Sequence, residues 1–227
     1  LGARILTGLG VNELSMSAAA EFAWNAAGRS PREFMLAWAT RRGDPDPGKV
    51  AQWWEHIEEP QRDLYISNLT MQGFWGLVSS LLKARRPCQP GASFLAGFPG
   101  EGRLDADIAS VRHAAEIAGA IPDKRFLHEA RYTLAALDLA RASRDLTVRL
   151  SGRKTLDEAD KRDASALFET IVQSLDRIDA ELEAFNQSVS LYPGQQYETT
   201  ADWFPFILSW RKETVGKVAE TARTLGV

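Results

Sequence analysis

The chain has 227 residues, of which 25% are charged, and its formal net charge is only −3. A nucleic-acid-binding protein usually carries a clear basic excess, so this balance argues against a nucleic-acid partner. Hydrophobic residues make up 44% of the chain, as in proteins with a packed core. No apolar run approaches the roughly 20 residues that span a bilayer. We therefore predict a soluble globular protein without a membrane span.

Cysteine content limits the covalent and metal chemistry of the chain. Cys88 is the single cysteine, which excludes an intrachain disulfide and a cysteine-rich zinc site. The first residues also lack the long apolar core and the cleavage site of a secretory signal, and the chain does not begin with Met. These features lead us to expect a processed chain or a piece of a longer protein.

The amino-terminal third divides into a short extended segment and a helical part. Residues 1–12 read as extended, with the run ARILTGLG in them ending in glycines, whereas 13–86 show helical periodicity. Residues 13–25 are Ala-rich and apolar on more than one face, which predicts a buried helix containing Trp24. Ser30 has the capping-box spacing to Glu33, so we expect the next helix to begin there.

Proline and glycine set the predicted breaks that follow. We expect helices over 48–58 and 61–86, separated at Pro60 because proline lacks the N–H of the helical ladder. Residues 87–103 are rich in Pro and Gly and are predicted to form a loop or a subdomain boundary.

Residues 104–227 have the periodicity of a carboxy-terminal helical bundle. The clearest pattern covers 155–186, where Thr155 and Glu158 have capping-box spacing and a heptad seam follows. The final helix has a similar apolar face. We therefore predict an all-α fold, an antiparallel helical bundle of one or two subdomains. The seam comprises Ala164, Phe168, Ile171, Leu175, Ile178, Leu182 and Phe185, and the final face Trp203, Ile207, Trp210, Thr214, Val218, Thr221 and Leu225.

No catalytic motif can be defended from the sequence. The histidines lack the Glu-x-x-His spacing of carboxylate-bridged metal bundles, and His113 with Glu116 is interpreted as a surface contact. Acidic pairs such as Asp105 and Asp107 could in principle serve glycoside hydrolysis, but they stand at predicted helix starts and turns, where carboxylates cap N–H groups. We predict no catalytic residue, metal ligand or cofactor.

The tryptophans are the feature that suggests a ligand. Trp53 and Trp54 are adjacent, and neighbouring helical side chains point about 100° apart, so we expect one of them to be partly exposed. An exposed indole can stack on a sugar ring. The favoured interpretation is that it covers a neighbouring helix or an absent domain.

The run SAAAEFAWN at 17–25 resembles the segment that follows the (β/α)₈ barrel in the O-GlcNAcase and bacterial hyaluronidase-like β-N-acetylglucosaminidase group of glycoside hydrolases. In that group an acidic-aromatic-x-Trp-Asn signature leads into a helical domain. The resemblance implies that 1–12 match the last barrel strand, that residues 30–225 match the helical domain, and that an upstream barrel and a carbohydrate are partners.

The resemblance implies no active site in this chain, because the catalytic acidic pair of that group belongs to the barrel. Asn12 lies near a sugar-binding asparagine of the group, but its spacing to Trp24 is shorter, so it is only a candidate contact with Trp53 and Trp54. The function expected is the helical carboxy-terminal region of a carbohydrate-active enzyme. The alternative is a free-standing interaction module whose seam at 155–185 binds a partner helix.

Overall fold

The computed structural model describes residues 21, 28–67, 69, 73–188 and 200–227, without the side chains of 186–188 and 200–211. All of the regular elements in this part of the chain are helical, which confirms the predicted all-α helical bundle. The extended segment predicted at 1–12 and the helix predicted around Trp24 lie outside the described residues.

Helix α2 (Pro31–Arg42) begins and ends as its sequence predicts. The Ser30 side chain accepts the Glu33 N–H, and the Glu33 carboxylate accepts the Ser30 N–H at 2.8 Å, which completes the capping box. Gly43 closes the helix in the left-handed region at φ 75°, where glycine carries no Cβ penalty. Phe34, Met35 and Trp38 are buried, and α2 packs on α3.

Helix α3 (Pro47–Ile66) runs through Pro60, so the break predicted there is wrong. Pro60 cannot donate to the carbonyl of His56 one turn earlier. The Ser110 hydroxyl of another helix donates to that carbonyl at 2.9 Å and replaces the missing bond. The helix expected over 61–86 is also divided, because α3 ends at Ile66 and α4 (Phe74–Lys83) begins after a turn.

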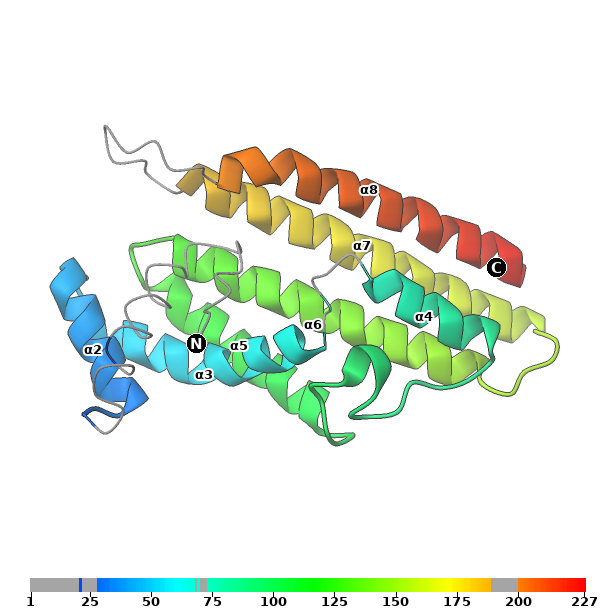
Figure 1. Ribbon diagram of the computed structural model, residues 1–227, viewed down its shortest axis with the longest axis horizontal. Helices are drawn as coiled ribbons and strands as arrows, with labels where there is room; N and C mark the ends of the chain where they lie inside the picture. Colours follow the sequence, from blue (N-terminus) through cyan, green and yellow to red (C-terminus); the bar gives the residue numbers. More distant parts are fainter. Residues whose placement is uncertain (1–20, 22–27, 68, 70–72, 189–199) are drawn as a thin grey trace.

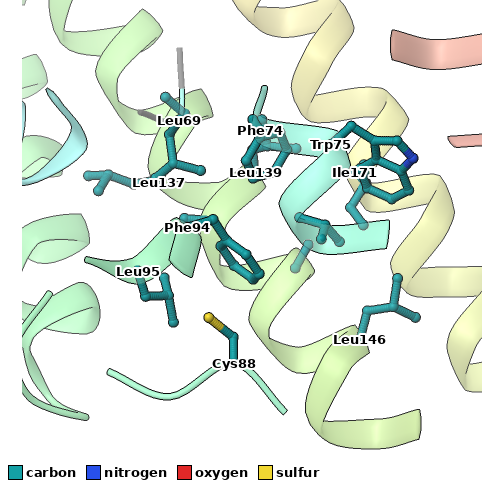
Figure 2. Close-up of a cluster of buried hydrophobic side chains, with 14 of the residues drawn as sticks. Leu69, Phe74, Trp75, Cys88, Phe94, Leu95, Leu137, Leu139, Leu146 and Ile171 are labelled. Atoms are coloured by element: carbon teal, nitrogen blue, oxygen red, sulfur yellow. The ribbon is translucent and has the colours of Figure 1, made fainter. Parts of the chain in front are cut away.

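The loop predicted at 87–103 is found over 87–102, with the 3₁₀ turn η1 (Ser93–Leu95) inside it, because Arg103 already begins a helix. The loop is packed, because Phe94, Leu95 and Phe98 are buried in the same core cluster as side chains of α4, α6 and α7. Figure 2 shows Phe94 and Leu95 inside this cluster, near Cys88. The Phe94 ring meets Phe74 of α4 edge-on, with 5.8 Å between the centroids.

The remaining helices are α5 (Arg103–Gly119), α6 (Arg125–Leu150), α7 (Glu158–Ser188) and α8 (Thr200–Leu225). In Figure 1, α6 and α7 run antiparallel along the length of the molecule and α8 lies along α7. The seam predicted on α7 is confirmed as a core face, and its partners come from the same chain. Leu182 is partly buried, and the fully buried seam residues are Ala164, Phe168, Ile171, Leu175, Ile178 and Phe185.

The start of α7 and the face of α8 differ in detail from expectation. Helix α7 begins at Glu158, and the Asp157 carboxylate, rather than Thr155, accepts the N–H of Asp160 at 2.8 Å. On α8, Val218 and Thr221 are buried as predicted, whereas the side chains of Trp203, Ile207 and Trp210 lie outside the described part.

The buried apolar side chains form two clusters. The larger lies among α4, η1, α6, α7 and α8, and the smaller lies where α2 and α3 meet the end of α5 and the start of α6. Helix α5 contributes to both, with Val111 in the larger and Ala114 in the smaller. The polar side chains discussed next lie where α3 packs on α5 and α6.

Candidate functional site

The adjacent tryptophans of α3 have different surroundings. Trp53 is 1% exposed, and its ring meets Phe126 of α6 edge-on with 4.8 Å between the centroids. Trp54 is partly exposed and packs against the smaller cluster. Trp53 is therefore a core contact between α3 and α6. Asn12 lies outside the described residues, so Trp54 is the candidate for the predicted carbohydrate or domain contact that the structure leaves partly exposed.

Arg103, at the start of α5, is the centre of an ion cluster with α3. Its Nε lies 2.6 Å from Asp63 Oδ2 and 3.3 Å from Asp107 Oδ1, and its terminal nitrogen lies 3.0 Å from Glu59 Oε1. Asp63 and Asp107 are buried, whereas Glu59 is exposed. One guanidinium thus offsets part of the cost of burying the Asp63 and Asp107 carboxyl groups.

The pKa of Asp107 suits a general acid or base, but its side chain is not accessible to a substrate. Burial raises its pKa to about 7, against the opposing effect of Arg103, and the neighbouring Asp63 carboxylate adds to the rise. A carboxyl that titrates near neutrality can act as a general acid or base only where it reaches a substrate. Asp107 is 3% exposed and is paired with Arg103, so we interpret the cluster as structural.

Glu129 of α6 is a second buried carboxyl. The Gln61 side-chain amide donates to its Oε1 at 2.9 Å and to Thr133 Oγ1 at 3.3 Å, which joins α3 to α6. Burial raises the pKa of Glu129 to about 8, despite the lowering effects of Gln61 and Arg125. At neutral pH the group is therefore mainly a neutral acid.

Two histidines meet at the edge of the α3–α5 contact. The rings of His56 and His113 lie edge-on with 4.5 Å between their centroids. His56 Nδ1 lies 3.3 Å from Ser110 Oγ, and His113 Nδ1 lies 3.2 Å from Glu116 Oε2. Burial, with a further contribution from His113, lowers the pKa of His56 and favours its neutral form.

The acidic side chains near the starts of α3 and α7 divide into two groups. Asp46 and Asp157 do accept N–H groups at the starts of α3 and α7. Asp160 is instead buried near the guanidinium groups of Arg149 and Arg153, at 3.4 and 3.5 Å. The sequence reasoning missed these ion clusters, and the Arg103–Asp107 spacing of one helical turn was the signal for one of them.

Comparison with known proteins identifies no relative of this chain. No protein-family model, curated protein or solved structure significantly matches this chain. Among the described residues, no group of three or more His, Cys, Asp or Glu side chains could hold a metal ion. None of the described helices is long and apolar enough to cross a membrane. The polar clusters between α3, α5 and α6 are therefore interpreted from their geometry alone.

Proposed function

We propose that this chain is the helical, non-catalytic region of a carbohydrate-active enzyme of the glycoside hydrolase kind. In this role it supports a barrel domain of the same protein or borders its substrate cleft. The resemblance of 17–25 to the post-barrel segment of the β-N-acetylglucosaminidase group supports the proposal that the neighbouring domain is a barrel. The helical bundle that follows agrees with that group in fold class.

The proposal that the chain is non-catalytic rests on the burial of two carboxyl groups with raised pKa values. Glycoside hydrolysis needs two carboxyl groups that face the scissile bond, one of them often with a raised pKa. Asp107 and Glu129 have raised pKa values, but both are buried and held by Arg103 and Gln61 respectively. Neither carboxyl can reach a sugar without opening the α3 contact.

The alternative of a free-standing interaction module would need a surface other than the α7 seam. Phe168, Ile171 and Leu175 are buried in the chain's own core, so the seam is not available to a partner helix. We therefore keep the supporting-domain role as the proposal.

The first test is an activity assay on the isolated chain. We expect no turnover of 4-nitrophenyl N-acetyl-β-glucosaminide or of other aryl glycosides. Activity that persists through purification and disappears in Asp107→Asn or Glu129→Gln would show that these carboxyls are catalytic and overturn the proposal.

The second test uses the full product of the gene. We expect a barrel upstream, and we expect Trp54→Ala to change its melting curve or its KM for an oligosaccharide. Tyr65→Ala, on the same helix and 55% exposed, is the matched control and should change neither. A gene product without a barrel would exclude the proposed role.

A further inference from the structure

We propose that His56 and His113 bind one late first-row divalent cation, with Zn²⁺ as the probe, and so clamp α3 to α5. The proposal is independent of the glycoside hydrolase role. It rests on the approach of two imidazoles from different helices and on the hydrogen bonds that fix each ring. Imidazole nitrogen is a preferred ligand of Zn²⁺, Cu²⁺ and Ni²⁺.

Pro60 determines the orientation of the Ser110 hydroxyl, and Ser110 then determines the tautomer of His56. Because Pro60 has no N–H, the His56 carbonyl is free to accept the Ser110 hydroxyl proton, over 2.9 Å. A hydroxyl has one proton, so towards His56 Nδ1, 3.3 Å away, Ser110 Oγ can only accept. The neutral ring therefore carries its proton on Nδ1 and its lone pair on Nε2.

Glu116 fixes the second ring in the same way. Its carboxylate lies 3.2 Å from His113 Nδ1 and can only accept, so Nδ1 carries the proton and Nε2 keeps the lone pair in the neutral ring. A carboxylate on the far nitrogen is the arrangement that orients metal-bound histidines and raises their basicity. Both imidazoles are thus held in the tautomer that ligates through Nε2.

The separation of the ring centroids is close to that of two imidazoles that share an ion. Two imidazoles bound to one Zn²⁺ at about 2.0–2.1 Å place their centroids about 5 Å apart at a tetrahedral angle. The observed separation is 4.5 Å with the ring planes at 85°, so the exposed His113 ring must turn to aim its Nε2 at the same ion as His56. His113 is exposed and His56 partly exposed, which leaves the ion open to solvent. Water would fill its other positions, since the described residues offer no third ligand.

The test is calorimetric titration of the whole chain with Zn²⁺ at pH 7.5, and with Mg²⁺ as the hard-ion control. We expect one equivalent of Zn²⁺ to bind and to raise Tm, and Mg²⁺ to do neither. His113→Ala, a substitution at an exposed position, should weaken Zn²⁺ binding at least tenfold without loss of fold. Glu116→Ala should weaken it about tenfold through the orientation of His113.

The remaining histidine supplies a matched control. His128 lies on α6 and bonds to Glu181 at 2.8 Å, away from the pair, so His128→Ala should leave Zn²⁺ binding unchanged. Cys88→Ser, at a buried position, should also leave it unchanged. In ¹⁵N spectra of the imidazoles, Nε2 of His56 and His113 should shift on Zn²⁺ addition. The proposal is overturned by the absence of binding, by full binding in His113→Ala, or by shifts confined to other side chains.

Discussion

Gly97 of the loop after η1 lies directly on the backbone of Asp63 in α3. A Cβ at this position would overlap the Asp63 carbonyl group, and the Gly97 N–H donates to Ser67 Oγ at 2.9 Å. Because the overlap is with backbone, no side-chain rotation can relieve it. The absence of a side chain therefore lets the loop dock on the end of α3.

Gly97→Ala should destabilise the fold by about 2–4 kcal/mol, because either the loop or α3 must move. Gly76→Ala on α4 is the control, since a Cβ there meets nothing within 4 Å. That substitution should be neutral or stabilise by about 0.5–1 kcal/mol. Chemical denaturation of both variants measures the difference, and equal stabilities would contradict the close docking of the loop.

Leu175→Ala should cost about 2–5 kcal/mol, because Leu175 is 1% exposed in the α7 seam. Leu175→Asp should unfold the carboxy-terminal half by burying a charge. The control is Val148→Ala on α6, because Val148 is 54% exposed and its truncation should be nearly neutral. A folded monomeric Leu175→Asp protein, seen by circular dichroism and light scattering, would show that the seam is not core.

Arg103→Met should cost about 3–5 kcal/mol near pH 8, because it leaves Asp63 and Asp107 buried without their cation. Protonation of Asp107, whose pKa burial raises to about 7, removes one of the uncompensated charges, so the loss relative to wild type should shrink at pH 5. Arg32→Met, which removes an exposed pair with Glu55 at 2.6 Å, should cost at most about 1 kcal/mol. A loss for Arg103→Met that is independent of pH would show that packing, rather than charge, dominates.

Glu129→Gln should remove a pH-dependent cost from the folded state. The pKa of Glu129 is raised from 4.5 to about 8, so the folded protein holds a proton that the unfolded chain releases in this interval. Wild-type stability should therefore fall as pH rises from about 4.5 to about 8. Glutamine can still accept from Gln61 and is neutral throughout.

Between pH 5 and pH 8.5 we expect Glu129→Gln to gain on the order of 2–4 kcal/mol over wild type. Urea denaturation across this range measures the gain. Glu169→Gln, which neutralises an exposed carboxylate on α7, should leave the wild-type pH profile nearly unchanged. If Glu129→Gln followed the wild-type profile, the buried carboxyl would have to be ionised in the folded state.

The sequence by itself determined the elements whose causes are local or periodic. The Ser30–Glu33 box predicts the start of α2 because both partners lie in one turn. The α7 seam predicts a buried face because a strict alternation of four and three keeps one apolar line on a helix. The all-α class follows from the same periodicity repeated along the chain.

Only the tertiary structure decided the points at which distant residues supply a missing partner. Pro60 predicts a break, yet α3 continues because Ser110, 54 positions away from His56, donates to the freed carbonyl. Asp63 and Asp107 could be buried because Arg103 lies between them. The His56–His113 pair has no linear motif either, since its ligands approach from two helices. Interhelical hydrogen bonds and charges of this kind depend on three-dimensional proximity, which no local spacing encodes.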